Sequence, residues 1–225
     1  MRGVILFDFG GTLDADGARW SVRFYSAYLA AGGQEPFTMF EEAFRASDRA
    51  LGRVAGIGTV GFRAMVDLQA ALVLAHLPDG PALRREQIVD DFHSGSLAVV
   101  RRNQELLARL HQSYRLAVVS NFTGNLGPCL EELDLMRYFS AVADSGRVGV
   151  TKPDPRLFRH ALTSLGATSE PTWMVGDNFE ADIRPAADLG MATAWLAPPA
   201  ARSPDARLPT ARLTTLTELA AVLNS

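Results

Sequence analysis

The chain has 225 residues, and its 22 Lys and Arg nearly balance 25 Asp and Glu, for a formal net charge of −3. This balance argues against the strongly basic surface that binds a nucleic acid or an anionic membrane, and we expect neither as a partner. The single cysteine, Cys129, cannot form an intrachain disulfide, which favours a reducing compartment and a cytoplasmic protein. Every basic residue is an arginine except Lys152.

Short apolar runs along the chain predict the strands of a parallel sheet. The first run, residues 3–7, is too short for a signal peptide or a transmembrane helix and is typical of a strand buried on both faces. Similar runs follow at 116–119, 173–175 and 192–196, with a weaker one at 141–143. Helical patterns alternate with them, at about 97–111, 125–136, 155–166 and 180–189. This alternation predicts an α/β fold with a parallel sheet at its core.

Residues 17 to about 95 interrupt the alternation, because they contain no convincing strand pattern. Glycine and proline turns divide them into predicted helices, at 18–31, 37–52, 59–76 and 81–92. We interpret this segment as an all-helical insertion after the first strand. Near the C-terminus, we expect an irregular loop at residues 198–209 and a closing helix at residues 214–223.

Polar residues stand at the ends of three predicted strands. Asp8 follows the first strand, Ser120 and Asn121 follow the second, and Asp177 follows the run at 173–175. Ligands bind outside the carboxyl ends of the strands in open parallel sheets, which favours a functional site at this edge. The alternatives are ordinary ones: Asp8 could be a turn residue, and the Ser-Asn pair could cap a loop.

Lys152 and Asp182 add two charged groups to these strand ends. A solvated surface lysine is the ordinary expectation. In a chain that otherwise uses arginine, however, a lone lysine hints at a position that needs a compact ammonium. Asp182 lies five residues after Asp177, and two carboxylates at such a junction suit Mg²⁺. Helix capping and compensation of the helix dipole are the alternatives for this pair.

Taken together, these residues suit phosphoryl transfer through an aspartyl-phosphate, which is a recognised role of carboxylate nucleophiles. A carboxylate that attacks a phosphate dianion meets like-charge repulsion. A metal ion and an ammonium offset this repulsion. Asp177 and Asp182 would hold the metal ion, and Lys152 supplies the ammonium.

The sequence resembles the haloacid dehalogenase superfamily in four motifs that occur in order and span nearly the whole chain. They are Asp8-Phe9-Gly10-Gly11-Thr12-Leu13, Ser120-Asn121, Lys152-Pro153, and Gly176-Asp177 with Asp182. The resemblance implies a Rossmann-like catalytic core, at residues 1–16 and 94–225. It also implies a helical cap at residues 17–93, where the insertion lies.

The resemblance further implies a role for each motif. Asp8 would be the nucleophile, and Lys152 would steady Asp8 and the phosphoryl charge. The residues expected to bind the substrate are Ser120, Asn121, Gly11 and Thr12. The expected Mg²⁺ site comprises Asp8, the backbone carbonyl of Gly10, and Asp177. Asp182 would support these ligands without binding the ion directly.

One position departs from the family pattern. The family's phosphatases carry a second Asp two residues after the nucleophile, as general acid/base, and here that residue is Gly10. General acid–base catalysis is typically worth about 10²–10⁴-fold in rate. We expect a substrate that needs no proton, a substitute acid, or an enzyme of weak activity. Asp14 and Asp16 are the candidates for the substitute acid because they lie close in sequence.

Three functions remain open from the sequence. The main expectation is a Mg²⁺-dependent phosphatase, monomeric or homodimeric, that acts on a small phosphorylated metabolite. A dehalogenase-like hydrolase that needs no metal is the second, and a non-catalytic phosphate- or metabolite-binding protein is the third. A phosphonate hydrolase is nearly excluded, because the family's members of that kind use a cap lysine and residues 17–93 contain none.

Overall fold

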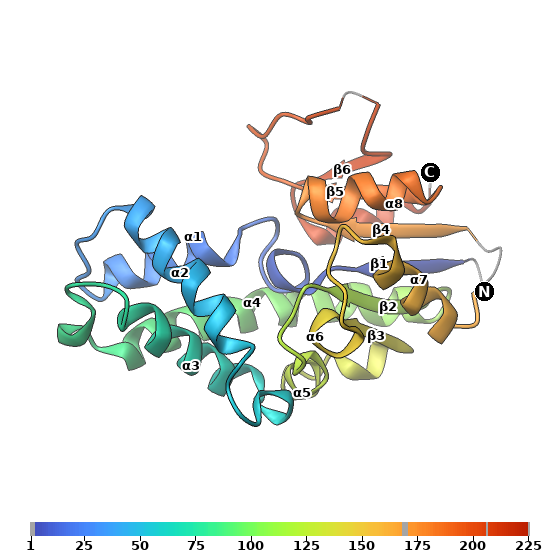
Figure 1. The fold of residues 1–225 in the computed structure, drawn as a ribbon. Helices are drawn as coiled ribbons and strands as arrows, with labels where there is room; N and C mark the ends of the chain where they lie inside the picture. The colour runs from blue at the N-terminus through green and yellow to red at the C-terminus, as the bar shows by residue number, and fades with distance from the viewer. Residues whose placement is uncertain (1–2, 168–170, 206, 225) are drawn as a thin grey trace.

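Residues 3–167, 171–205 and 207–224 are described in the computed structural model of the protein. They form a sheet of six strands, each parallel to its neighbours, in the order β3-β2-β1-β4-β5-β6 (Figure 1). The strands are β1 (Val4–Phe7), β2 (Arg115–Ser120), β3 (Ala141–Asp144), β4 (Thr172–Gly176), β5 (Ala192–Leu196) and β6 (Ala211–Leu213). The predicted α/β fold is thereby confirmed, and β6 is an addition that the sequence pattern does not predict.

β1 stands where the strand order changes direction, since β2 and β4 flank it on opposite sides. The register pairs Phe7 with Val118 of β2 and with Val175 of β4. The carboxyl ends of these three strands therefore lie side by side. Asp8 follows β1, Asn121 follows β2 and Asp177 follows β4. Such a switch point is where open α/β sheets bind ligands.

Side chains of β1 alternate between two cores, one on each face of the sheet. Ile5 and Phe7 belong to a core that includes the inner face of α4 (Arg85–His111). Val4 and Leu6 belong to a second core that is built on α7 (Pro155–Ser164). All four side chains are fully buried, and each contributes about 1.5–3 kcal/mol relative to an exposed one. Burial on both faces explains the continuous apolar run.

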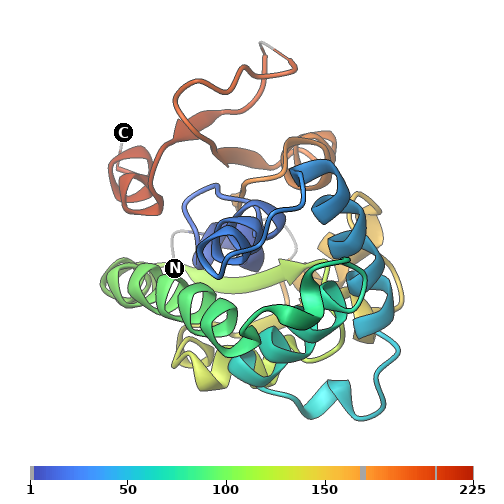
Figure 2. The same cartoon turned by 90° about the vertical axis from the view of Figure 1, so that its left-hand side faces the viewer.

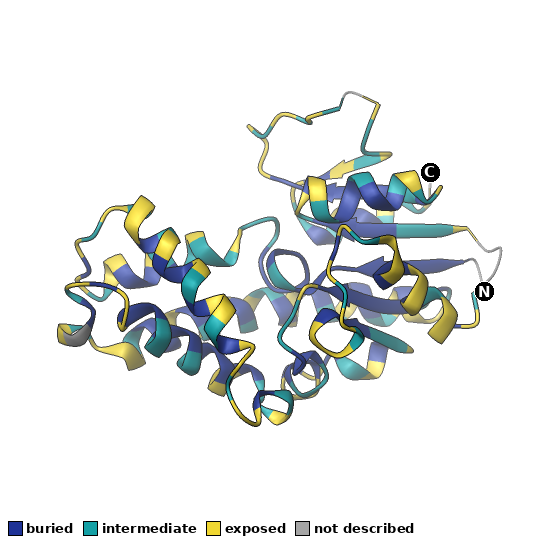
Figure 3. Cartoon of the chain, in the orientation of Figure 1, coloured by how far each residue is buried: buried dark blue, intermediate teal, exposed yellow. Residues whose placement is uncertain are grey.

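Shorter helices surround the sheet at its other connections, namely α5 (Leu126–Glu132), α6 (Ser145–Val148), α8 (Arg184–Asp188) and α9 (Leu219–Val222). Figure 3 shows the strands and the inner faces of the helices as mostly buried, and the outer helix faces as largely exposed. Within the described part of the chain, none of the helices combines the length and the apolarity that crossing a membrane requires.

A group of helices lies beyond the edge to which the strands point (Figure 1). It consists of α1 (Trp20–Ala30), α2 (Phe37–Leu51), α3 (Phe62–Leu74) and the first half of α4, and we call it the helical region. Figure 2, viewed from that end, shows these helices in front of the sheet. Their positions confirm the first three helices predicted between the first two strands.

α4 is a single helix of 27 residues, whereas the sequence predicts two helices, at 81–92 and 97–111. Gly95 does not interrupt it, because α1 packs against this stretch and anchors it. The Arg23 guanidinium of α1 donates a hydrogen bond to Ser96 Oγ at 2.7 Å, one residue after Gly95. The expected boundary between core and cap falls inside this helix, and the division into two domains stays a prediction.

Candidate active site

Lys152 lies between two carboxylates at the carboxyl edge of the sheet. Its Nζ is 2.8 Å from Asp8 Oδ1 and 2.6 Å from Asp182 Oδ1. The second contact is a hydrogen bond, whereas the first is an ion pair without hydrogen-bond geometry. Only 2% of the Lys152 side chain is exposed. Burial alone would lower the pKa of Lys152, but Asp182 and Asp8 outweigh it and raise that pKa, so the ammonium stays charged.

Asn121 holds the backbone of Lys152 in place. The Lys152 N–H donates to Asn121 Oδ1 at 2.7 Å, and Asn121 Nδ2 donates to the Lys152 carbonyl at 3.0 Å. Asn121 follows β2 and Lys152 precedes α7, so these two bonds tie neighbouring loops together. The substrate-binding role predicted for Asn121 concerns its backbone N–H and stays a prediction, while its side chain positions Lys152.

Three carboxylates converge beside this lysine. Asp8, Asp177 and Asp182 each offer one oxygen within 4.8 Å of the others. Burial, and then the charges of Asp8 and Asp182, raise the pKa of Asp177 well above its usual range. Burial also raises the pKa of Asp182, although Lys152 opposes it. Three carboxylates against one ammonium leave an excess of two negative charges when all are ionised, and a hard divalent cation would neutralise this excess.

Two glycines make room for these carboxylates. Gly11 has φ +88°, and a Cβ there would lie 2.6 Å from Asp177 Oδ2. A Cβ at Gly176 would overlap the Asp182 carboxylate. Larger residues at either position would therefore push a carboxylate out of the cluster.

Gly11 and Thr12 lie behind the cluster. Thr12 is fully buried and its hydroxyl donates to Asp177 Oδ1 at 3.3 Å, while the Gly11 N–H donates to Asp14 Oδ1 at 2.8 Å. The sequence predicts that both residues bind substrate. Both residues contact carboxylates, neither lies on the wall of the cavity described below, and their role in substrate binding stays a prediction.

Trp20 occupies the space beside Gly10. A Cβ at Gly10 would lie 3.2 Å from Trp20 Nε1 and 3.3 Å from Trp20 Cε2, closer than a normal van der Waals contact. The indole is held in turn by its hydrogen bond to Asp14 Oδ2, at 3.0 Å, and by edge contacts with the rings of Phe92 and Phe122. A larger side chain at position 10 would therefore be tightly packed against this ring.

The expectation that Asp14 supplies a substitute acid meets a structural obstacle. The Asp14 carboxylate is fully buried and accepts bonds from the Gly11 N–H, the Trp20 indole, Arg23 and Ser96. An acid that is committed to an ion pair and three further donors has no free oxygen to turn towards a substrate.

Asp16 is also occupied by neighbours. It pairs with Arg102 at 2.5 Å and accepts a hydrogen bond from the Leu216 N–H at 3.1 Å. Neither Asp14 nor Asp16 lies on the cavity wall.

The loop after β2 is shaped by two residues that the sequence reasoning missed. Asp144, at the end of β3, is buried and accepts bonds from the N–H groups of Gly124, Leu126 and Gly146. Ser145 Oγ accepts from the Phe122 N–H at 2.9 Å. The signal that could have found Asp144 is its position, since it is another polar residue that ends a buried strand.

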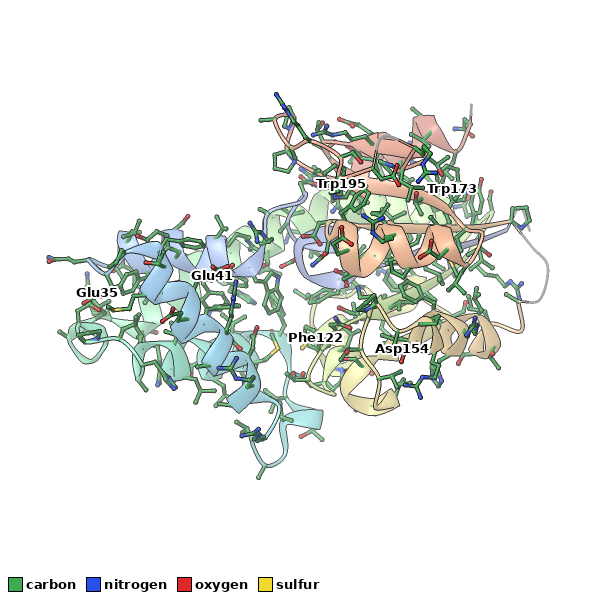
Figure 4. All side chains as sticks on the ribbon, turned by 45° about the horizontal axis from the view of Figure 1, so that its top comes forward. Glu35, Glu41, Phe122, Asp154, Trp173 and Trp195 are labelled. Atoms are coloured by element: carbon green, nitrogen blue, oxygen red, sulfur yellow. The ribbon has the colours of Figure 1, made fainter. Side chains whose placement is uncertain are left out.

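One cavity of about 490 Å³ joins the sheet edge to the helical region. From the sheet edge, its wall includes Asp8, Gly10, Ser120, Asn121, Lys152, Asp177 and Asp182. From the helical region, its wall includes Arg19, Trp20, Phe44, Asp48, Arg49, Leu51, Met65 and Gln69. Phe122 lies between the two parts (Figure 4).

The residues contributed by the helical region were not predicted as site residues. A weak signal for them exists in the sequence. Gln69 lies four residues after Met65, on the buried face of α3. Asp48 lies four residues after Phe44, on α2. A polar residue in register with apolar helix positions indicates a place where the helix faces something other than packed core.

A comparison with known protein families agrees with this site. A family model for haloacid dehalogenase-like hydrolases matches residues 3–190. The chain belongs to this family. The family assignment confirms the resemblance that the four motifs indicate.

Individual relatives of this hydrolase agree with the family assignment. A haloacid dehalogenase-like hydrolase domain-containing protein 3 of Bos taurus is 30% identical over 82% of this chain and 77% of its own length. Phosphoserine phosphatase of Thermus thermophilus is 48% identical over 28% of this chain, and the match spans only 25% of that relative. A magnesium-bound structure of the HAD-hydrolase YfnB of Bacillus subtilis covers all of both chains, with a TM-score of 0.61 at 21% identity, and shows that the fold is shared.

Proposed function

We propose that this hydrolase is a Mg²⁺-dependent phosphatase that acts on small phosphorylated metabolites through an aspartyl-phosphate at Asp8. The observation that carries the proposal is the convergence of Asp8, Asp177 and Asp182 beside the buried Lys152 ammonium. The partial match to a phosphoserine phosphatase supports the same chemistry. In this proposal, residues 1–16 and 94–225 form the catalytic core, and residues 17–93 form a cap that limits access of water.

The chain's own residues would perform the reaction in two steps. Asp8 attacks the phosphorus atom, and the bond between phosphorus and the leaving oxygen breaks. Lys152 offsets charge on the phosphoryl oxygens, and the Ser120 hydroxyl and the Asn121 N–H donate hydrogen bonds to them. Water then attacks phosphorus, which releases inorganic phosphate and restores the Asp8 carboxylate.

The residues at the site fit a magnesium ion, because their carboxylates exceed the nearby positive charge by two. Asp8, Asp177 and the Gly10 carbonyl would hold the ion, with Asp182 behind them. When bound, Mg²⁺ would supply the positive charge that allows a phosphate dianion to approach the Asp8 carboxylate.

Gly10 restricts the substrates that such an enzyme converts well. No side chain at position 10 can protonate the leaving oxygen, and Trp20 fills the space beside it. Substrates with leaving groups of low pKa, such as acyl phosphates and aryl phosphates, lose least from this absence. Alkyl phosphates would lose most of the roughly 10²–10⁴-fold that general acid–base catalysis provides.

Two other functions are tested by the same experiment. A metal-free dehalogenase-like hydrolase has less support, because a 2-haloacid is itself an anion and would meet the uncompensated charge of the acid cluster. A non-catalytic phosphate-binding protein is motivated by Gly10 alone. Both would share the fold and the cavity with a phosphatase.

The experiment measures phosphate release from an aryl phosphate and from acetyl phosphate, with Mg²⁺ or with a chelator, for the wild type and Asp8→Asn. The proposal expects release only from the wild type and only with Mg²⁺. Equal rates in the two proteins would refute it. Metal-independent halide release from 2-haloacids would favour the dehalogenase-like function, and binding of Mg²⁺ and phosphate without turnover would favour the binding protein.

A further inference from the structure

The wall of the cavity that faces the acid cluster carries, besides two arginines, a pair of polar side chains that are hydrogen-bonded to each other. Asp48 comes from α2 and Gln69 from α3, and both line the cavity. Phe44 and Leu51 of α2 and Met65 of α3 lie beside them on the same wall. The sheet edge supplies groups for a phosphate, but these two residues belong to the opposite side, so they face a different part of any ligand that fills the cavity.

The hydrogen bonds of Gln69 leave only acceptor atoms free on the Gln69 and Asp48 side chains. Gln69 is 1% exposed, and its Nε2 donates to Ser47 Oγ at 2.7 Å and to Asp48 Oδ1 at 2.8 Å. Both amide hydrogens are therefore used, and the amide orientation is determined because a carboxylate can only accept. Among the described residues, none donates a hydrogen bond to Gln69 Oε1 or to Asp48 Oδ2.

Asp48 is exposed towards the cavity, whereas Gln69 beside it is buried. The protein around the Asp48 carboxylate removes part of its hydration and raises its pKa to about 6, although Gln69 and Arg49 oppose this rise. A carboxylate kept in such a place, with one oxygen unpaired and a buried amide oriented next to it, is typical of a binding site. At the buried position of Gln69, packing alone would be served better by an apolar residue.

We propose that Asp48 and Gln69 form a second subsite, which binds a primary ammonium group at the end of the substrate remote from its phosphate. The inference rests on the proposed function, in which the phosphate lies at Asp8. An ammonium has three donors and a positive charge, which matches two acceptors of which one is anionic. Phe44, Leu51 and Met65 would cover the apolar spacer between the two ends. The substrate class is therefore a phosphomonoester that carries an amine.

Arg19 and Arg49 also line the cavity and could instead attract a second anionic group. The test therefore compares three families of non-hydrolysable probes, in which a chain of three to six carbons joins a phosphonate to an ammonium, a methyl or a carboxylate group. Calorimetry in the presence of Mg²⁺ measures their dissociation constants for the wild type, Asp48→Asn, Gln69→Leu and Glu41→Gln. Glu41 is the matched control, because it is an acid on the same helix that does not line the cavity (Figure 4).

The subsite predicts that the best ammonium probe binds the wild type roughly 10- to 100-fold more tightly than its methyl counterpart. Asp48→Asn should reduce this preference to within a few-fold, Gln69→Leu should reduce it in part, and Glu41→Gln should leave it unchanged. Because phosphonates are not hydrolysed, a preserved ammonium preference without phosphatase activity would contradict the proposed function alone. Equal binding of ammonium and methyl probes, tighter binding of the carboxylate probe, or an unchanged preference in Asp48→Asn would each overturn the subsite.

Discussion

The indole of Trp20 packs against Gly10 so closely that a Cβ there would lie 3.2 Å from Nε1. Gly10→Asp, which would restore the family's general acid, must therefore shift the ring or be strained against it. We expect Gly10→Asp alone to raise the turnover of alkyl phosphates only slightly, and Gly10→Asp combined with Trp20→Leu to raise it by roughly 10-fold or more. Steady-state kinetics on an alkyl and an aryl phosphate check this, with Trp20→Leu alone as control. A large gain from Gly10→Asp alone would show that the indole is no obstacle.

Lys152 should not tolerate arginine, although both residues are cations. The ammonium is almost fully buried and lies within 2.8 Å of two carboxylate oxygens, so a planar guanidinium of larger size cannot take its place. We expect Lys152→Arg to lower kcat/KM by at least about 100-fold. Arg85→Lys is a suitable control, because Arg85 makes an exposed ion pair with Asp67 in the helical region. Near wild-type activity in Lys152→Arg would contradict the assignment of Lys152.

Much of the site's position follows from the sequence, because a continuous apolar run defines a doubly buried strand and its end defines the sheet edge. Asp8, Ser120 and Asp177 occur at such ends, and the use of a single lysine in an arginine-rich chain indicates a special role for residue 152. The contact of Trp20 with Gly10 could not be predicted, because it depends on how α1 packs after the chain has left the sheet.

Other features escaped prediction for related reasons. α4 continues through Gly95 because tertiary contacts with α1 outweigh the low helix propensity of glycine. β6 has three residues, too few for a periodic pattern. The pair Asp48 and Gln69 comes from two helices whose mutual register no local pattern reveals.

We expect Asp14 to stabilise the fold and not to act as a catalytic acid. Its buried carboxylate accepts an ion pair and hydrogen bonds from α1, α4 and the loop after β1. We expect Asp14→Asn to lower the free energy of unfolding by about 3 kcal/mol, because it leaves Arg23 without its counter-charge. The pH profile of the remaining activity should be unchanged. Urea unfolding and pH–rate measurements test this, and loss of a limb of the pH profile in a stable variant would restore Asp14 as the acid.

Asp48 should make stability depend on pH in a defined direction. Loss of hydration raises its pKa from 3.8 to about 6, so the folded state binds a proton more tightly than the unfolded state. Stability from this group is therefore present near pH 4 and is lost as the pH rises through 6. We expect Asp48→Asn to be more stable than the wild type by about 1 kcal/mol at pH 7.5, after allowance for solvent screening, and equally stable near pH 4.

Urea unfolding at the two pH values measures this difference, and Glu41→Gln again serves as the control. If Asp48→Asn were less stable than the wild type at pH 7.5, the Asp48 carboxylate would be a stabilising group. Its presence would then be explained by stability, without a ligand.

The central claim, that Asp8 carries the phosphoryl group, is tested most directly by trapping the intermediate. The wild type is mixed with acetyl phosphate and Mg²⁺, quenched in acid within the first turnovers and analysed by mass spectrometry. The account predicts one added phosphoryl group, located at Asp8, that is absent from Asp8→Asn and from a sample with chelator. Phosphate release without any phosphorylated Asp8, or the same added mass in Asp8→Asn, would contradict it.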